Sequence, residues 1–376
     1  MKIGITCYPT YGGSGVVATE LGKALALMGH EIHFISYAIP HRLNKFTENV
    51  FFHEVEMSSY PLFEHSLYSL SLASKMMEVA EFEELDILHV HYAIPHAVSG
   101  YLAKEVLKKN NKDLKLITTL HGTDITLVGL EPSFLPLVKF SIEQSDGVTA
   151  VSRFLKEKTI TNYHIEKDIE VIHNFIDTEV FKPVCNQNFK EHVAPEGEKI
   201  LMHTSNFRKV KRVEDTIHVL AKVREEIPAK LVLIGDGPER SECTRLVREL
   251  KLEKDVIFLG KQDGIGDILS TADVFLLPSQ SESFGLAALE AMACGKPVIS
   301  SSVGGIPELV IHNETGYIAE IGDVNRMAKY TVDLLTNERK YAKFSENSRI
   351  RSVDTFDTSV IIPQYVKYYE KILNGK

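Results

Sequence analysis

The sequence predicts an α/β protein of two tandem Rossmann-like domains, each a doubly wound parallel sheet, facing a cleft. First, short apolar runs rich in Val and Ile alternate with longer segments of helical period, which is typical of a parallel sheet covered by helices on both faces. Second, this alternation restarts near residue 200. Third, 376 residues are too many for one ordinary core, because a domain usually takes roughly 100–200 residues.

In the first half, the apolar runs predict strands at 2–7, 31–36, 86–91, 115–120, 147–151 and 169–172. Apolar residues at helical spacing predict helices between them, at 15–28, 66–84, 95–109 and 152–162.

In the second half, the same reasoning predicts strands at 200–202, 231–234, 256–259, 274–277 and 297–300. Helices are expected at 212–226, 239–250, 265–271, 284–294 and near the C-terminus at 358–376. The polar stretch 182–198 has few apolar anchors and is interpreted as a linker or long loop near the boundary. We therefore expect an acceptor-binding domain at 1–173 plus 357–376 and a donor-binding domain at 174–356.

Composition excludes several classes of protein. Hydrophobic residues at 44% and charged residues at 25% match a globular protein rather than a disordered or fibrous one. A net charge of −9 disfavours a nucleic-acid binder. No apolar run reaches the ~18 residues of a membrane span, and there is no signal-peptide core. Four scattered cysteines, Cys7, Cys185, Cys243 and Cys294, favour a reducing, cytoplasmic location.

A glycine-rich loop, Gly12 to Gly15, links the first strand to the first helix. Glycines let a ligand approach the backbone, and the helix start offers N–H groups to an anion. Gly13-x-Gly15-x-x-Ala18 also fits a dinucleotide pattern, but the next strand ends without the acid that would hold a ribose. A cradle for a phosphate or substrate, a nicotinamide site and a turn without a ligand all remain open.

The segment 281–297 carries two acids, Glu282 before a predicted helix and Glu290 about two turns inside it. Ser283 is a plausible N-cap of this helix, and Gly295 with Pro297 ends it. A carboxylate accepts hydrogen bonds from adjacent sugar hydroxyls, while the helix start offers amides to a phosphate. Apolar neighbours surround Glu290, so a buried carboxylate with a partner is expected rather than a solvent-facing one.

Here the chain resembles the retaining, GT-B-fold sugar-nucleotide transferases of glycosyltransferase family 4. Glu282-x7-Glu290 resembles the E-x7-E motif of that family, and the segments 235–239, 302–308 and 315–317 resemble its neighbouring loops. The resemblance covers nearly the whole chain.

The resemblance implies a site for a UDP-sugar. In the family, an Arg and a Lys neutralise the donor diphosphate, and these roles pass to Arg208 and Lys211, with Arg212 as an alternative to Lys211. Such cations stabilise the charge that develops on a leaving diphosphate. The donor-binding set is completed by Gly13, Ser14, Asn206, Gln262, Glu282, Phe284, Gly285, Leu286 and Glu290.

A histidine, His121, follows the strand 115–120, and in the family a histidine at this point approaches the hydroxyls of the donor sugar. We assign catalytic roles to His121, Arg208, Lys211 and Glu282. His89, His91 and His96 lie at another strand end, but no carboxylate or Cys completes a ligand set around them. We expect no metal and no cofactor.

The segments 3–9, 12–15, 91–96 and 118–124 resemble one branch of the family. That branch transfers N-acetylglucosamine from UDP-N-acetylglucosamine to the hydroxyl of L-malate with retention, the first step of bacillithiol biosynthesis. The two carboxylates of malate need cations and hydrogen-bond donors. The acceptor-binding candidates are Ser14, Tyr92, Thr123 and Arg153, the last of which can form a bidentate contact with a carboxylate.

Retention commonly uses a carboxylate nucleophile, but Asp124 is the nearest acid in the first domain and lies beside His121. We therefore hypothesise same-face attack, in which the leaving diphosphate takes the malate proton. Three other readings stay open: a family 4 enzyme with an inositol phosphate or lipid-linked sugar as acceptor, a UDP-sugar epimerase, and a non-catalytic UDP-sugar sensor. No nucleic acid and no membrane insertion are expected, and a homo-oligomer is left open.

Overall fold

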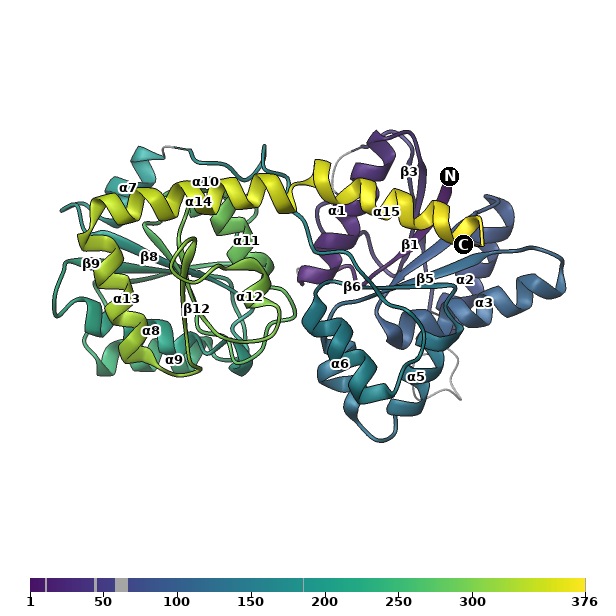
Figure 1. The fold of residues 1–376 in the computed structure, drawn as a ribbon, viewed down its shortest axis with the longest axis horizontal. Helices are drawn as coiled ribbons and strands as arrows, with labels where there is room; N and C mark the ends of the chain where they lie inside the picture. The colour runs from purple at the N-terminus through teal and green to yellow at the C-terminus, as the bar shows by residue number, and fades with distance from the viewer. Residues whose placement is uncertain (11, 44–45, 58–66, 185, 376) are drawn as a thin grey trace. The chain divides into compact units, whose positions relative to one another are not determined.

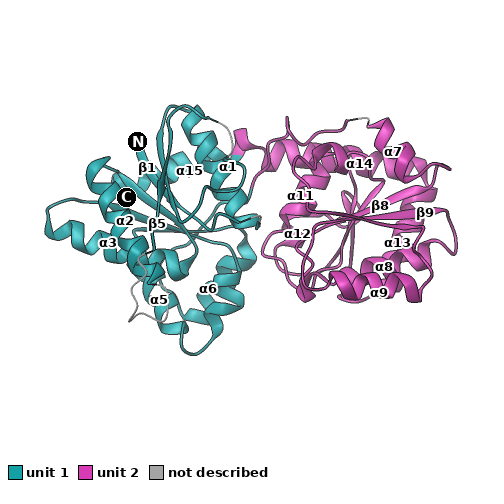
Figure 2. Ribbon diagram, turned by 180° about the vertical axis from the view of Figure 1, so that it is seen from behind, with its two compact units in different colours: residues 1–174, 361–376 teal, residues 175–360 magenta. Residues whose placement is uncertain are grey.

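The structure is a computed structural model that describes residues 1–10, 12–43, 46–57, 67–184 and 186–375. Cys185, the first residue of the expected helix 66–84 and the last residue of the expected C-terminal helix lie outside this range. The chain divides into two compact units (Figure 2): unit 1 contains residues 1–174 and 361–376, and unit 2 contains residues 175–360.

Unit 1 is built on a seven-stranded parallel sheet in the order β3-β2-β1-β4-β5-β6-β7. Its strands are β1 Lys2–Thr6, β2 Glu31–Ser36, β3 Val50–Glu54, β4 Ile87–His91, β5 Lys115–Leu120, β6 Gly147–Ala150 and β7 Glu170–Val171. Its helices are α1 Gly13–Leu27, α2 Tyr68–Phe82, the π-helical η1 Ala93–Ala97, α3 Val98–Lys109, α4 Thr123–Thr126, the 3-10 helix η2 Val128–Leu130, α5 Leu135–Gln144 and α6 Arg153–Tyr163.

Unit 2 repeats this plan with a six-stranded parallel sheet in the order β10-β9-β8-β11-β12-β13. Its strands are β8 Lys199–Thr204, β9 Ala229–Ile234, β10 Val256–Gly260, β11 Val274–Leu277, β12 Val298–Ser301 and β13 Gly316–Ala319. Its helices are α7 Gln187–Val193, the 3-10 helix η3 Lys209–Lys211, α8 Val213–Val223, α9 Arg240–Glu249, α10 Gly266–Leu269, α11 Leu286–Ala293, α12 Ile306–Leu309, α13 Val324–Thr336 and α14 Glu338–Phe356.

The last helix, α15 Thr358–Leu373, begins at the end of unit 2 and packs within unit 1 (Figure 1). Its Tyr368 hydroxyl accepts a hydrogen bond from the Val148 N–H at 2.8 Å and donates to the Val148 carbonyl at 3.1 Å. Gly147 makes this approach possible, because a Cβ there would lie 2.8 Å from the same hydroxyl. The C-terminal helix is thus a layer of unit 1.

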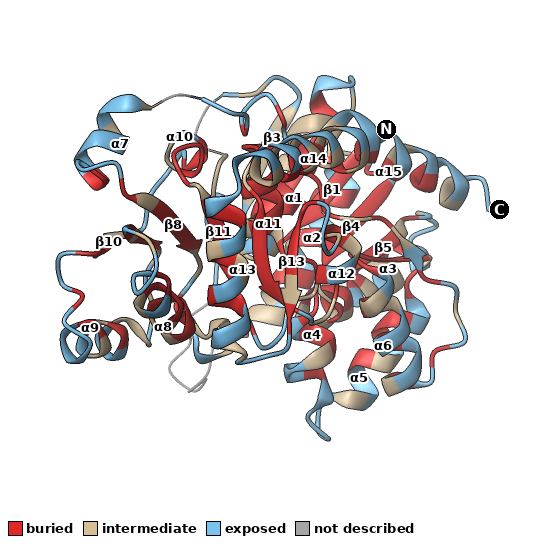
Figure 3. Cartoon of the chain, turned by 60° about the vertical axis from the view of Figure 1, so that its left-hand side comes forward, coloured by how far each residue is buried: buried red, intermediate tan, exposed pale blue. Residues whose placement is uncertain are grey.

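Both units follow the strand pattern that the sequence predicts. The central strands are buried, and the helices present exposed residues on their outer sides (Figure 3). Two edge strands, β3 and β13, were not predicted, because their residues carry no long Val- and Ile-rich run. The linker expected at 182–198 is wrong in part: residues 187–193 form α7, capped by the Asn186 side chain, which accepts from the Phe189 N–H.

The strand order determines where ligands bind in each unit. In open parallel sheets, ligands bind outside the carboxyl ends of the strands where the order reverses. This switch point lies between β1 and β4 in unit 1 and between β8 and β11 in unit 2. Among the described residues, no helix is both long enough and apolar enough to cross a membrane.

Candidate active site

The loops at the switch point of unit 1 bring three predicted acceptor residues together. Ser14, at the start of α1 after β1, donates a hydrogen bond to the Tyr92 hydroxyl at 2.9 Å. Tyr92 follows β4 and is also hydrogen-bonded to Thr123, which begins α4 after β5. Gly15 lets the first loop fold tightly, because a side chain there would collide with the carbonyl of Tyr8.

Tyr92 is held in an uncommon backbone conformation, with φ at 96°. Such strain in a residue other than glycine costs of order 1–3 kcal/mol and often occurs at functional sites. Burial raises the pKa of Tyr92 to about 12, so the phenol stays neutral and can both donate and accept.

Asp124 ties these loops together through backbone amides. One of its oxygens accepts from the Gly122 N–H at 2.9 Å and the His121 N–H at 3.3 Å, and the other accepts from the Ala93 N–H at 2.9 Å. Burial raises the pKa of Asp124 to about 6, although these three bonds favour its charged form. Asp124 therefore holds the loops after β4 and β5 in register and is occupied by backbone donors.

His121 rests on a second histidine at the end of β4. The Nε2 of His121 lies 2.7 Å from the Nδ1 of His91, and the two rings stack with centroids 5.0 Å apart. Burial lowers the pKa of His121 to about 3 and that of His91 well below its ordinary value, so both rings are neutral near pH 7. Because both rings are neutral, one of the two facing nitrogens, His91 Nδ1 or His121 Nε2, carries the hydrogen and the other accepts it.

The other nitrogen of His91 decides which ring donates. Its Nε2 is buried and has no hydrogen-bond partner among the described residues. If His121 donated, His91 would carry its proton on this Nε2, and a buried N–H without an acceptor costs about 1–3 kcal/mol. The favoured arrangement has His91 Nδ1–H donating to His121 Nε2, which leaves the proton of His121 on Nδ1.

Behind this pair, a buried polar chain reaches the C-terminal helix. His89 Nδ1 lies 2.8 Å from the hydroxyl of Tyr369 in α15, and its Nε2 lies 2.7 Å from the hydroxyl of Thr119. Thr119 in turn bonds the hydroxyl of Thr149 at 2.7 Å. His89 and His91 were expected at one strand end, whereas the contact with Tyr369 was not predicted. The available signal was the position of Tyr369 on one face of the predicted C-terminal helix.

Two further predicted residues of unit 1 lie at loop ends. Gly13 is the first residue of α1, beside Ser14. Arg153 is the first residue of α6 and is exposed. The N-cap of that helix is Ser152, whose side chain accepts from the Leu155 N–H at 3.2 Å.

At the switch point of unit 2, the structure joins a predicted base to a predicted acid. The Lys211 ammonium lies 2.7 Å from Oε1 of Glu282, and Ser279 donates to the same oxygen at 2.8 Å. Lys211 comes from η3 after β8, and Glu282 from the loop after β11. The pair is mostly shielded, with 23% of the lysine side chain and 11% of the glutamate side chain exposed. Ser279 was not among the predicted site residues.

The neighbouring base has a different partner. Arg212 forms a bidentate contact with Asp215, at 2.7 Å and 3.1 Å, at the start of α8. This contact holds Arg212 at the start of its own helix, whereas Lys211 reaches across to the loop after β11. Arg208 and Asn206 are exposed in the loop between β8 and η3.

Glycines bring the loops of unit 2 into backbone contact. A side chain on Gly304 would collide with the carbonyl of Glu282, and one on Gly305 with that of Ser283. The Gly305 N–H donates to the Glu282 carbonyl at 3.1 Å. These contacts fix the backbone that carries Glu282.

The predicted start of the helix after Glu282 is wrong. α11 begins at Leu286, and its N-cap is Gly285 with φ at 99° rather than Ser283. The positive φ at the N-cap position favours glycine there. Glu290 is buried within α11, with 6% of its surface exposed, and Phe284 is buried just before the helix.

A buried histidine missed by the sequence analysis supports the loop after β8. His203 Nδ1 lies 2.8 Å from the Leu276 carbonyl of β11, and its Nε2 lies 2.8 Å from the Ser205 hydroxyl. Burial lowers the pKa of His203 to about 4, so the ring is neutral near pH 7. It links β8 to β11 at the point where the strand order reverses.

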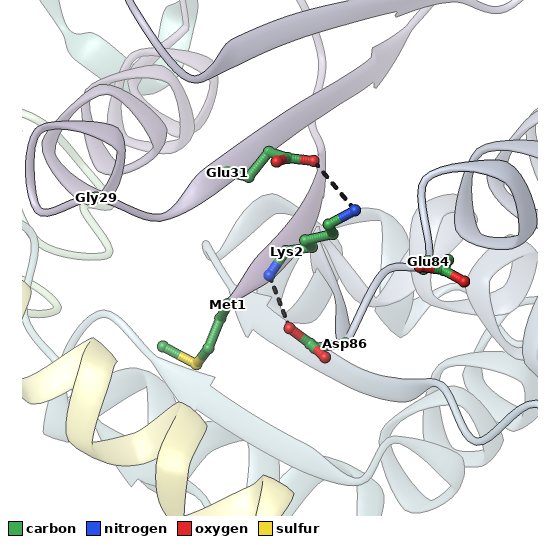
Figure 4. Close-up of a pocket in the computed structure, with 6 residues that line it drawn as sticks. All are labelled: Met1, Lys2, Gly29, Glu31, Glu84 and Asp86. Atoms are coloured by element: carbon green, nitrogen blue, oxygen red, sulfur yellow. Dashed lines mark hydrogen bonds and ion pairs between the residues drawn. The ribbon is translucent and has the colours of Figure 1, made fainter.

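The surface of the described residues includes the following two hollows. One of about 270 Å³, lined by Asp236, Gly237 and Lys261, is at the carboxyl ends of β9 and β10, next to the predicted Gln262. The other, of about 500 Å³, is lined by residues such as Lys2 and Glu31 at the amino ends of the strands of unit 1 (Figure 4). Ligands bind at the opposite edge in this architecture, so only the first hollow belongs to the candidate site.

Known proteins match the chain over its whole length. A model of glycosyltransferase family 4 matches residues 11–180, and a model of glycosyl transferases group 1 matches residues 185–351. The N-acetyl-alpha-D-glucosaminyl L-malate synthase of Bacillus anthracis is 51% identical over 381 aligned positions, which cover 100% of this chain and 99% of that protein.

Solved structures share the fold. The Anabaena protein HepE in complex with UDP and glucose superposes with a TM-score of 0.84 at 21% identity, covering 98% of this chain and 99% of that one. A glycosyltransferase from Rickettsia africae superposes with a TM-score of 0.82 at 22% identity, covering 100% and 99%. The matched family models, the full-length relative and the two parallel-sheet units together show that the chain is a hexosyltransferase of the GT-B fold and belongs to glycosyltransferase family 4.

Proposed function

We propose that the chain transfers N-acetylglucosamine from UDP-N-acetylglucosamine to the hydroxyl of L-malate with retention, the step that begins bacillithiol biosynthesis. The observation that carries this proposal is the 51% identity, over the full chain, to a protein named for the L-malate product. In this proposal unit 2 binds the donor and unit 1 binds the acceptor.

The donor is held by opposite charges in unit 2. The Lys211 ammonium and the Arg208 guanidinium neutralise the diphosphate, and Glu290 accepts hydrogen bonds from the ribose hydroxyls. The 2.7 Å contact with Glu282 supports the choice of Lys211 over Arg212, since it orients the ammonium before the donor arrives. Glu282 then accepts from a hydroxyl of the sugar. The exposed Gln262 and the hollow beside it suit the edge of the uracil base.

The acceptor is held in unit 1 by three hydroxyl groups and one cation. The hydroxyls of Ser14, Tyr92 and Thr123 form one connected cluster that can donate to a carboxylate of malate. Arg153 supplies the cation for the second carboxylate. His121, with its proton on Nδ1, donates to a hydroxyl of the transferred sugar.

The proposed reaction needs no carboxylate nucleophile from unit 1, where Asp124 is occupied by three backbone N–H groups. The bond between the anomeric carbon and the diphosphate oxygen breaks, and the malate hydroxyl oxygen bonds to that carbon on the same face. The malate proton passes to a phosphate oxygen of the departing UDP. Arg208 and Lys211 stabilise the charge on that leaving group.

The test is UDP release from UDP-N-acetylglucosamine, measured with and without L-malate, with mass spectrometry of the product. The proposal predicts release that depends on malate and a product with the mass of N-acetylglucosaminyl malate. Turnover of the donor without any acceptor indicates an epimerase or hydrolase. UDP-sugar binding without turnover indicates a sensor, and turnover with an inositol phosphate in place of malate indicates another acceptor. Each of these three results contradicts the proposal.

A further inference from the structure

Three potential metal ligands meet on one side of the sheet of unit 1, away from its switch point. They are His33 on β2, His53 on β3 and Glu83, which directly follows α2. One ligand atom from each lies within 4.8 Å of the others. Their positions in the sequence are far apart, so no local motif announced them.

The strand register explains why the two histidines meet. β2 and β3 run parallel with Ile35 opposite His53, so His33 is the diagonal neighbour of His53 on the same face of the sheet. The His33 Nδ1 lies 2.9 Å from the His53 Nε2, and the rings stack with centroids 5.2 Å apart. His33 is buried and His53 is half-buried.

Glu83 is held in place from both sides of its peptide. Its N–H donates to the Val79 carbonyl at 2.9 Å, which closes the last turn of α2. Its own carbonyl accepts a hydrogen bond from the Lys2 ammonium at 2.9 Å. The carboxylate therefore extends from a fixed backbone toward the two imidazoles.

A second carboxylate orients the buried histidine. Glu31 Oε1 lies 3.0 Å from the His33 Nε2. This contact places the His33 proton on Nε2 and leaves a lone pair on Nδ1, the nitrogen that points to His53 and Glu83. Metal-binding histidines are commonly held by a carboxylate on their other nitrogen in this way.

We propose that His33, His53 and Glu83 form a zinc site, with Glu31 positioning His33 behind it. Two imidazoles and one carboxylate are a ligand set that Zn²⁺ takes, with water in the fourth position. The carboxylates of Glu31 and Glu83 add negative charge, which favours a cation beside the two imidazoles. The ion would tie the edge strand β3 and the end of α2 to β2.

This site is separate from the site of glycosyl transfer. The reaction site is expected where the strand order reverses, between β1 and β4, whereas β2 and β3 lie at one end of the sheet. Glu31 and Lys2 lie at the amino ends of their strands, where their side chains are 3.6 Å apart (Figure 4). Zinc binding at this site can therefore be tested independently of the proposed function.

The histidine pair also satisfies itself without a metal, since one ring can donate to the other. The experiment must therefore measure binding directly. The full chain, without a polyhistidine tag, is stripped with a chelator and titrated with Zn²⁺ by calorimetry. Cobalt(II) is added in a parallel titration, because its visible absorption reports tetrahedral nitrogen and oxygen ligands.

The variants His53→Ala and Glu83→Gln remove one ligand each and leave the buried His33 intact. We expect one Zn²⁺ per wild-type chain and an affinity loss of at least about 100-fold in each variant, since two ligands remain of three. Glu31→Gln, which weakens the positioning contact, should lose about 10–100-fold. The matched control is Glu78→Gln on α2, which removes an equal charge near His53 from outside the ligand set and should change affinity less than about threefold.

Thermal melting separates loss of the site from loss of the fold. In chelator, His53→Ala and Glu83→Gln should melt as cooperative folded proteins, and added Zn²⁺ should raise the melting temperature of the wild type but not of these variants. Absence of saturable Zn²⁺ binding by the wild type overturns the inference. So does undiminished binding in both variants, which would place the ion elsewhere, for example at the histidines beside His121.

Discussion

The two units share one strand order, but different side chains join the loops at the point where that order reverses. In unit 1 the loops are joined by Asp124 and by uncharged groups, of which the buried His91–His121 pair and the half-buried Ser14–Tyr92 bond are examples. In unit 2 they are joined by the ion pair of Lys211 and Glu282. One strand order can therefore carry loops of different chemistry, because the loops rather than the strands determine what binds.

The difference has a physical reason in the proposed reaction. A nucleotide diphosphate carries charge that grows as it leaves, so cations gain most when they are held near it. The sugar presents hydroxyls, for which neutral donors and acceptors in a buried setting give orientation without a large desolvation cost. The two carboxylates of the acceptor need hydrogen-bond donors and the cation of Arg153. Each unit can therefore be perturbed separately.

The largest expected effect is at the cations of unit 2. Lys211→Met and Arg208→Met should each lower kcat by about 10²–10³-fold, because each removes a positive group from the leaving diphosphate. The control is Lys209→Met, an exposed neighbour in the same short helix, which should leave kcat nearly unchanged. The measurement is the steady-state rate of UDP release at saturating substrates. Near-normal rates in both variants would contradict the leaving-group account.

The next effect is a difference in acid sensitivity between the units. Burial lowers the pKa of His89 to about 3, of His121 to about 3 and of His96 to about 4, and lowers that of His91 well below 6.5. Below pH 6.5 these histidines bind protons in the unfolded chain, whereas in the folded chain they stay neutral until the pH is much lower. The free energy of unfolding of unit 1 should therefore fall as the pH drops from 6.5 toward 4, by about 1.4 kcal/mol per pH unit for each such proton.

Two groups refine that expectation. Asp124, whose pKa is raised to about 6, stabilises the folded state at low pH and loses this contribution as the pH rises through 6, so it offsets one histidine. In unit 2, His203 is the corresponding histidine among those described, with its pKa lowered to about 4. Scanning calorimetry at pH 7 and pH 5, with UDP added to mark the donor-binding unit, should show unit 1 losing more stability. A larger loss in unit 2 would refute the contrast.

A smaller effect is expected at Glu290 in unit 2. Glu290→Gln removes the charge from a hydrogen bond to the ribose, which is worth about 1.5–3 kcal/mol, so UDP should bind about 10–100-fold more weakly. Titration calorimetry with UDP and with 2′-deoxy-UDP provides the control. Loss of the ribose hydroxyl should weaken binding to the wild type but add little to the variant. Equal losses in both proteins would remove Glu290 from the ribose site.

The smallest effect concerns the neutral pair of unit 1. His91→Leu removes the donor to His121 and should lower kcat about tenfold with little change in KM for the donor, since one neutral hydrogen bond is worth about 0.5–1.5 kcal/mol. His91→Asn keeps an N–H near the position of Nδ1 and should restore most of the rate. If Asn and Leu behave alike, His91 fills space and does not orient His121.

The fold was largely predictable because its central strands are buried on both faces and appear as continuous apolar runs. β3 was not predicted, because its residues Val50–Glu54 lie at the sheet edge, are half-exposed or exposed, and mix apolar with polar side chains. α7 was not predicted, because a helix of seven residues in a polar stretch is too short to show a helical pattern of apolar residues. Strand ends could be placed from sequence, and with them the candidate loops.

The contacts within the site were less predictable, because they depend on residues far apart in the chain. Lys211 and Glu282 are 71 positions apart, and the sequence left Arg212 as an alternative to Lys211, whereas the structure pairs Arg212 with Asp215. His89 meets Tyr369 across 280 positions, a contact made by the return of the C-terminal helix to unit 1. Spacing alone carries no information about such pairs.

The central proposal is that unit 2 binds the donor and unit 1 binds the acceptor. It is tested most directly by hydrogen exchange with mass spectrometry in the presence of UDP and of L-malate. With UDP alone, slower exchange should be confined to unit 2, in the loops 204–212 and 281–291. Adding L-malate should then extend protection to the loops 12–16, 91–97 and 121–126 of unit 1. Protection of the unit 1 loops by UDP alone, with unit 2 unchanged, would contradict the account.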